Sequence, residues 1–296
     1  MSNISEANLV ADFEKIGVCA GDTVLIRASL GAVGRIDGGA EAFINALLKA
    51  VGVNGTIVSL AFTDGGAFIK KPKIENAFDL KKKSYAGALP NAMIRRNDAF
   101  RSSHPMCSYV AIGKFAEQIT KNHDENSPAY EPIRKIIQLD GKSILVGCVD
   151  NSPGFTTTHL AEADLGLLSL SVFPKLRSTF YKSRDGEIKL FRRTDPGLCS
   201  NSFYKFYALY VKNKILTTGF IGGAYSIIAP AKECYEIEYA ALKHNHKINI
   251  CESNMCFTCN AGRWDRIHHA PGYFCRIILR KIKSKFSLLL KDSKNK

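Results

Sequence analysis

Short apolar runs alternate with helical patterns along most of the chain. The apolar runs, which are typical of buried strands, cover residues 23–26, 56–61, 109–112 and 144–149. Apolar positions that recur on one helix face predict helices at residues 8–16, 40–51, 89–96, 114–120, 132–138, 201–211 and 230–243. Strands that alternate with helices favour an α/β fold with one central sheet.

The second half of the chain carries a different pattern. Residues 167–181 and 187–193 are strand-like and flank Arg184-Asp185-Gly186, as in a β-hairpin. The composition then shifts near residue 250. We therefore predict one α/β domain over residues 1–250, with the hairpin inserted in it, and a Cys-rich segment with a basic tail over residues 251–296.

The loop after the run at 144–149 ends in a helix start. A turn cluster at residues 151–154 comes first, and then His159 and Glu162 open a helical pattern. Open α/β sheets place their chemistry at such a strand end, and residues three apart share one helix face. The alternative is a Thr N-cap with a solvated His and a Glu that favours the positive helix end.

Two further stretches carry small or polar residues. Residues 27–34, after the first apolar run, place Ser and Gly before a helix, where backbone N–H groups can hold an anion. No Gly-Lys-Ser/Thr follows, so this is not a P-loop, and a plain strand-to-helix turn is the alternative. Residues 100–108 combine Arg101, His104 and several hydroxyls, which suit a phosphate or acyl group. His104 precedes a Pro, and either a structural hydrogen bond or a cofactor contact explains it.

The net charge of the chain limits the classes of binding partner but does not identify one. The net charge is +14, from 41 Lys and Arg against 27 Asp and Glu. Residues 276–296 supply half of it, which leaves a mildly basic body. Such a balance fits an anionic ligand, nucleic acid or an acidic membrane surface. Basic and aromatic residues do not interleave in any nucleic-acid motif, so nucleic acid ranks lowest.

The first 18 residues are polar and lack the apolar core of an export signal. No apolar run is long enough to span a bilayer. We therefore expect a cytoplasmic protein whose nine Cys are reduced thiols.

Three of these Cys are clustered: Cys251, Cys256 and Cys259. Thiols this close bind zinc, with Cys275 or a nearby His as the fourth ligand. The first three also match the plant-type iron–sulfur spacing, although Cys275 follows too soon for it. Unligated free thiols are the alternative. The fourth ligand is unassigned, so the sequence leaves a structural zinc ion as one of two open interpretations.

The tail at residues 276–290 is an amphipathic helix by pattern. Apolar residues fall on one side and Lys and Arg mostly on the other, which is typical of a helix at an acidic membrane surface. The alternative is a helix packed on the body with a solvated basic face. In the first case the protein is bound peripherally to the inner face of the membrane, and in the second it does not contact the membrane.

Taken in order, several short pieces make the chain similar to the aminoglycoside 3-N-acetyltransferase family. The similarity covers residues 7–243. The pieces are Gly21-Asp22-Thr-Val-Leu-Ile, Ser29-Leu30-Gly31-Ala-Val-Gly34, Phe100-Arg101-Ser102 with His104-Pro105 and Ser108, Ser127-Pro128, Gly141-Lys142, Thr158-His159 with Glu162, and Gly219-Phe-Ile-Gly222. The resemblance implies an α/β/α sandwich around a mixed central sheet, and transfer of acetyl from acetyl-CoA to an amine.

The resemblance also assigns roles. It implies that Ser29, Leu30, Gly31 and Val33 meet the cofactor, with Arg101 and Ser108 as further contacts, and that Thr157 and His159 form the acetyl end. The family usually has His where this chain has Arg27, so Arg27 receives no role.

The chemistry is consistent with these roles. An amine needs a base near pKa 7 before it attacks a thioester, and His suits that task. His159 is the candidate base. Glu162 fixes its tautomer or receives the ammonium group of the substrate. Backbone N–H groups at residues 156–158, or the Thr157 hydroxyl, are the candidate oxyanion donors.

The acceptor is the open question. Aminoglycosides are polycations and need an acidic cleft, whereas the Lys-rich loop at residues 65–83 would repel them. We therefore expect a nucleotide-linked or surface-polysaccharide amino sugar, with an aminoglycoside, and hence antibiotic resistance, as the alternative. A nucleic-acid-binding protein with a zinc tail is a lower alternative, and a catalytically inactive CoA sensor is another.

Overall fold

A seven-stranded sheet is the centre of the part of the chain that the computed structural model describes, residues 3–65 and 71–292, with side chains up to residue 284. The strand order is β3-β4-β2-β1-β5-β9-β8. The strands are β1 (Thr23–Ala28), β2 (Thr56–Leu60), β3 (Phe100–Arg101), β4 (Tyr109–Gly113), β5 (Lys142–Val146), β8 (Thr217–Ile221) and β9 (Ala224–Pro230).

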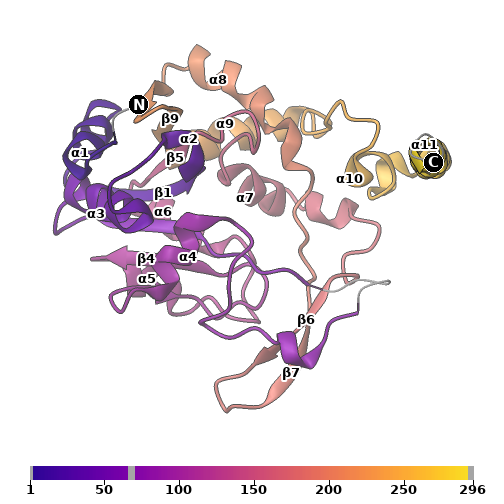
Figure 1. The fold of residues 1–296 in the computed structure, drawn as a ribbon, viewed down its shortest axis with the longest axis horizontal. Helices are drawn as coiled ribbons and strands as arrows, with labels where there is room; N and C mark the ends of the chain where they lie inside the picture. The colour runs from indigo at the N-terminus through magenta and orange to yellow at the C-terminus, as the bar shows by residue number, and fades with distance from the viewer. Residues whose placement is uncertain (1–2, 66–70, 293–296) are drawn as a thin grey trace.

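Helices cover both faces of this sheet (Figure 1). Alternate residues of β1 show why. Val24 and Ile26 pack in one core with α1 and α3, whereas Leu25 packs in another core with α6. The helices are α1 (Glu6–Lys15), α2 (Leu30–Val33), α3 (Gly39–Val51), α4 (Ala88–Arg95), α5 (Ala116–Thr120), α6 (Glu131–Gln138), α7 (Thr157–Asp164), α8 (Tyr207–Lys212), α9 (Ala231–His244), α10 (Phe257–Asn260) and α11 (Ala270–Asp292), with 3-10 turns η1 (Ile74–Asn76), η2 (Leu167–Leu170), η3 (Ser200–Phe206) and η4 (Trp264–His269). The predicted α/β/α sandwich is confirmed.

The sheet is mixed, as predicted. β1 pairs in parallel with both β2 and β5, and the outer pairs are antiparallel. The carboxyl ends of β1 and β5 therefore lie at the same edge. There the Ser29 N–H donates to Val146 O over 2.8 Å. This register brings the loop after β1 beside the loop that leads to α7.

The predicted hairpin is present as β6 (Ser178–Lys182) and β7 (Ile188–Arg192), a separate two-stranded sheet. Figure 1 shows it projecting from the body. Its first strand is shorter than the sequence pattern indicated. Residues 167–170 form η2, because Gly166 adopts the left-handed conformation that ends α7.

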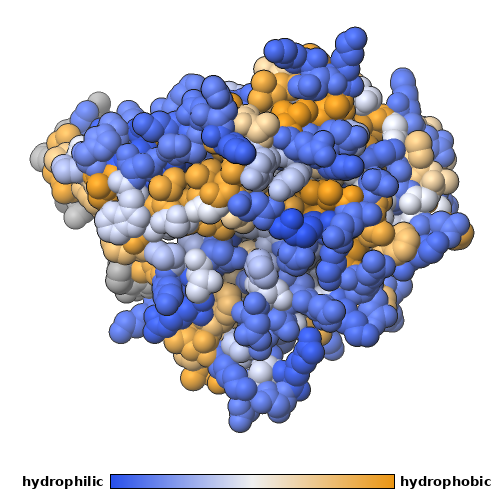
Figure 2. Space-filling view, turned by 180° about the vertical axis from the view of Figure 1, so that it is seen from behind, coloured by the Kyte–Doolittle hydropathy of each residue, from blue (hydrophilic) through white to orange (hydrophobic). Residues whose placement is uncertain are grey.

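The predicted tail helix lies within α11, which Figure 1 places at the edge of the molecule. Its apolar side is open: Ile278, Leu279 and Ile282 are each about half exposed. From behind, hydrophobic side chains reach the surface at the edge where α11 lies and in the upper half of the face (Figure 2). Phe286 and Leu289 lie outside the described side chains. Membrane contact by this helix stays a prediction.

Among the described helices, none combines the length and the apolar character that crossing a bilayer requires.

Candidate active site

The first turn of α7 holds a histidine–carboxylate pair. His159 Nδ1 lies 2.8 Å from Glu162 Oε2, and the spacing of three residues makes this contact local. The Glu162 side chain has no exposed surface, whereas the His159 side chain is 14% exposed. A hydrogen that Nδ1 shares with Glu162 leaves Nε2 of His159 with the free lone pair.

Both oxygens of Glu162 are occupied. Oε2 also accepts from the Leu198 N–H over 3.3 Å, and Oε1 accepts from Asn249 Nδ2 over 2.5 Å. A buried carboxylate with these partners orients the imidazole, and it is closed to the ammonium group of a substrate. Sequence reasoning missed Leu198 and Asn249, since they lie far from Glu162 in the chain.

Aromatic rings hold the imidazole from two sides. His159 stacks on Tyr130 with ring centroids 4.9 Å apart, and Phe203 meets it edge-on at the same separation. Gly197 completes the enclosure. A Cβ at that position would lie 2.8 Å from His159 Nδ1 and would also collide with the Tyr130 hydroxyl. The enclosed ring also lines a cavity.

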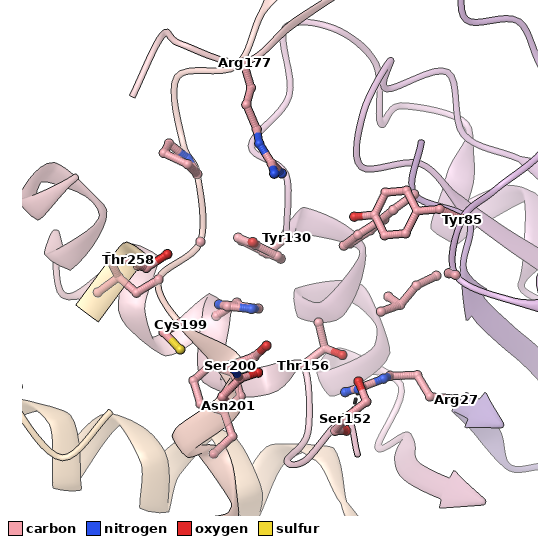
Figure 3. Close-up of a pocket in the computed structure, with 18 of the residues that line it drawn as sticks. Arg27, Tyr85, Tyr130, Ser152, Thr156, Arg177, Cys199, Ser200, Asn201 and Thr258 are labelled. Carbon is pink, nitrogen blue, oxygen red and sulfur yellow. Dashed lines mark hydrogen bonds between the residues drawn. The ribbon is translucent and has the colours of Figure 1, made fainter. Parts of the chain in front are cut away.

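This cavity has a volume of about 850 Å³, a size typical of small-molecule sites. Arg27, Ser152 and Thr156 stand at one end of it, and Cys199 and Thr258 stand at the other (Figure 3). Arg177 points into it near Tyr130. His159 also lines this cavity.

Arg27 has a structural partner set. Its Nη1 donates to Gly154 O over 2.9 Å, and its Nη2 donates to Ser152 O over 2.6 Å and to the Ser152 hydroxyl. Burial lowers the pKa of the guanidinium. Asp22 pairs instead with Lys142, over 2.7 Å. Arg27 therefore fixes the turn before α7 and presents positive charge to the cavity.

Only part of the predicted cofactor loop faces the cavity. Ser29, at the N-cap of α2, lines it. Val33 is fully buried in the core below α1 and α3, and Leu30 packs against that core. Gly31 is exposed. Cofactor contact by Leu30 and Val33 thus rests on their backbone groups, and the assignment of this loop to acetyl-CoA stays a prediction.

Arg101 and Ser108 were predicted as cofactor contacts, and the structure places neither of them among the cavity-lining residues. Arg101 donates to the Leu80, Lys82 and Ala61 carbonyls and to the Ser108 hydroxyl, which itself donates to Ala61 O over 2.8 Å. Burial lowers the pKa of Arg101 to about 10. These residues bind the loop after β2 to the sheet. Their partners are backbone atoms, which the sequence does not reveal.

The Thr157 hydroxyl is not an oxyanion donor in this geometry. It is buried and donates to Glu238 Oε1 on α9 over 3.0 Å, as Thr158 does over 2.8 Å. Burial raises the pKa of Glu238 to about 8. Thr156, one residue earlier, lines the cavity instead.

The other histidine of interest is structural. His104 is buried, and its Nδ1 accepts from the Cys107 N–H over 2.9 Å. It stacks on His123, which is fully buried. Burial lowers the pKa of both imidazoles, that of His123 to about 4. The hydrogen-bond alternative for His104 therefore holds.

Three predicted metal ligands lie together. Cys251, Cys256 and Cys259 meet Cys199, a residue that the spacing argument left out. Cys275 is exposed on α11 and is not part of this cluster. Cys148, in the loop after β5, is only partly buried and lines the cavity.

A sequence comparison decides the family. The profile described as aminoglycoside 3-N-acetyltransferase matches residues 25–243. The chain belongs to this family. The predicted acetyl-CoA-dependent N-acetyltransferase, with acetyl-CoA as co-substrate, is confirmed at that level.

Curated relatives agree. An aminoglycoside N(3)-acetyltransferase III from a Salmonella species is 29% identical over 231 residues, which cover 72% of this chain and 77% of that protein. A type VII enzyme from Streptomyces paromomycinus is 28% identical over 176 residues, which cover 54% and 60%. The alignments span 57% of several other type III enzymes.

Solved structures share the fold. Apo aminoglycoside acetyltransferase AAC(3)-IVa superposes with a TM-score of 0.73 at 22% identity, over 88% of this chain and 97% of that one. AAC(3)-IIb gives 0.67 at 25% identity, over 83% and 98%. An AAC-IIIb structure, solved with CoASH, gives 0.65 at 24%, over 82% and 97%.

Proposed function

We propose that the protein acetylates a primary amine of an aminoglycoside-type amino sugar, with His159 as the general base. The observation that carries this proposal is the buried pair of His159 and Glu162, which opens onto a cavity lined by Ser29. The base and the predicted cofactor loop thus meet the same space.

The reaction needs no covalent enzyme intermediate. The amine nitrogen attacks the thioester carbonyl, while Nε2 of His159 accepts the proton that the nitrogen loses. Collapse of the tetrahedral intermediate breaks the C–S bond, and the CoA sulfur leaves as a thiolate that His159 can reprotonate. Backbone N–H groups at the start of α7, near Thr156, are the proposed donors to the oxyanion.

The relatives favour an aminoglycoside over the nucleotide-linked sugar that we expected from charge. The curated matches are aminoglycoside N(3)-acetyltransferases, and similar structures were solved with a gentamicin, with sisomicin or with apramycin. The repulsion argument relied on the loop at residues 65–83, of which residues 66–70 lie outside the described part. Acetylation at an aminoglycoside amine would make the protein a resistance enzyme.

The charge of the cavity lining supports a second candidate for the acceptor. The described residues that line the cavity include Arg27, Arg177 and Arg193 and no Asp or Glu. Such a lining suits an acceptor that carries negative charge, such as an amino sugar linked to a nucleotide diphosphate. This acceptor class would use the same base and the same cofactor end.

A thiol-release assay distinguishes the candidates. The purified full chain is mixed with acetyl-CoA and with gentamicin, sisomicin, apramycin or a nucleotide-linked amino sugar. We expect turnover with at least one aminoglycoside, and mass spectrometry of the product should show one added acetyl group. Turnover with the nucleotide sugar alone would establish the second candidate. If CoA binds and no amine is turned over, both candidates are wrong and the protein is a CoA sensor.

A further inference from the structure

Four thiols from two distant parts of the chain form one cluster. Cys199 precedes η3, whereas Cys251, Cys256 and Cys259 surround the start of α10. Their sulfur atoms all lie within 4.8 Å of one another, and Cys199 Sγ and Cys256 Sγ are 3.6 Å apart. All four are free thiols, and three of them are less than a tenth exposed.

This geometry fits a tetrahedral metal. Four Zn–S bonds of about 2.3 Å require sulfur atoms about 3.8 Å apart. The cluster is within reach of that arrangement without a change in the fold. Four sulfur ligands select zinc or iron and disfavour magnesium or calcium, which take oxygen ligands.

The surroundings also support a bound ion. The Cys251 N–H points at Cys259 Sγ over 3.4 Å, a contact that stabilises a thiolate. Lys205 Nζ donates to Ile250 O over 2.9 Å, and Arg266 Nε donates to Cys259 O over 2.6 Å. Backbone next to two of the thiols is therefore held in place by cationic side chains, which also offset negative charge on the sulfurs.

We propose that Cys199, Cys251, Cys256 and Cys259 hold one structural zinc ion. Four protein ligands close the coordination sphere, so the ion has no open position for a substrate. Its function is to join the segment around Cys199 to the segment around α10. The chain between these segments includes β8, β9 and α9. The ion thus adds a cross-link between two segments that hydrogen bonds such as that from Lys205 to Ile250 O already bring together.

The ion would also act on the active site at a distance. Leu198, whose N–H donates to Glu162, directly precedes Cys199. Asn249, whose amide donates to Glu162, lies two residues before Cys251, and its carbonyl accepts from Ser202 over 2.5 Å. Both buried partners of Glu162 thus sit beside ligands of the proposed ion. The metal is a positioning element for the His159–Glu162 pair.

Metal analysis tests the site without reference to acetyl transfer. The full chain, purified without a His tag or chelator, is analysed for zinc and iron by mass spectrometry of the elements. We expect about one zinc ion per chain. Cys199→Ser should lower this content at least several-fold, and Cys275→Ser, at an exposed thiol outside the cluster, should leave it unchanged.

Cobalt gives a second measurement. Protein grown with Co²⁺ should show the near-ultraviolet sulfur-to-cobalt band and the visible bands of a tetrahedral site, and Cys199→Ser should weaken both. If Cys199→Ser fails to fold, the metal content of the wild-type protein alone decides whether the four thiols bind zinc. Three results would overturn the proposal: a metal-free wild type, iron in place of zinc, or disulfides among these four residues.

Discussion

The Glu162 carboxylate is fully buried and lies 2.8 Å from His159 Nδ1. It therefore sets which imidazole nitrogen carries the hydrogen. Glu162→Gln keeps the shape and loses the charge, so the imidazole is no longer held in the base-competent tautomer. We expect kcat to fall about 10²- to 10⁴-fold, with little change in KM for acetyl-CoA. Glu236→Gln, at an exposed position of α9, is the matched control.

His159→Ala tests the base itself. Steady-state turnover should drop about 10²- to 10⁴-fold, because no other described group in the cavity replaces Nε2. Binding of CoA, measured by calorimetry, should persist, since the predicted cofactor loop is separate. Unchanged turnover would rule out His159 as the base.

Gly197→Ala introduces a methyl group 2.8 Å from the His159 ring. The ring or the Tyr130 hydroxyl must move, and a small displacement of a catalytic group costs about 10²-fold in rate. We expect a folded protein with reduced kcat. Gly272→Ala, in α11, meets only the flexible end of Arg276 and serves as control. Equal activity of the two variants would show that the enclosure of His159 is unimportant.

Arg101→Gln separates a structural role from cofactor binding. It removes a partly buried charge that donates to three carbonyls and a hydroxyl, and we expect a loss of about 2 kcal/mol in unfolding free energy. KM for acetyl-CoA should not change. Arg95→Gln, at an exposed position of α4, is the control. A raised KM with unchanged stability would restore the cofactor assignment.

Glu238 predicts a pH dependence of stability. Burial raises its pKa from 4.5 to about 8, so the folded state keeps a proton that the unfolded state releases. Stability then decreases as pH rises from about 4.5 to about 8, by up to about 1.4 kcal/mol per pH unit. Glu238→Gln removes this dependence. In urea unfolding, the free energy of unfolding of the variant should rise relative to that of the wild type as the pH is raised from about 5.5 to about 8.5. A constant difference would contradict the shifted pKa.

Sequence patterns predicted the fold well because its signals are local. The apolar runs of β1, β2, β4 and β5 and the turn before α7 are each contained in a few residues. The pair of His159 and Glu162 could be predicted for the same reason, since one helical turn brings the two side chains together.

Contacts between residues far apart in the chain could not be predicted from the sequence. Arg101 looked like an anion ligand because its partners are carbonyl oxygens of a distant loop. Thr157 looked like an oxyanion donor because the sequence does not show Glu238 behind it. Cys199 lies about fifty residues before the other thiols, and a search for a fourth sulfur beyond the local cluster was the one signal that could have found it.

The cavity takes its two ends from different parts of the chain. The last residues of β1 and the loop that follows β5 build the end with Arg27 and Ser152, whereas Cys199 and Thr258 stand at the opposite end. Those two belong to three lining segments outside the seven-stranded sheet, within residues 171–177, 196–203 and 256–262. Substitutions in these segments reshape the acceptor wall and leave the strand ends intact. On the proposed function, selectivity for the amine can therefore diverge while the acetyl donor is retained. The positions to randomise for new acceptors are those in these segments that contact neither the His159–Glu162 pair nor the four thiols, such as Arg177 and Thr258.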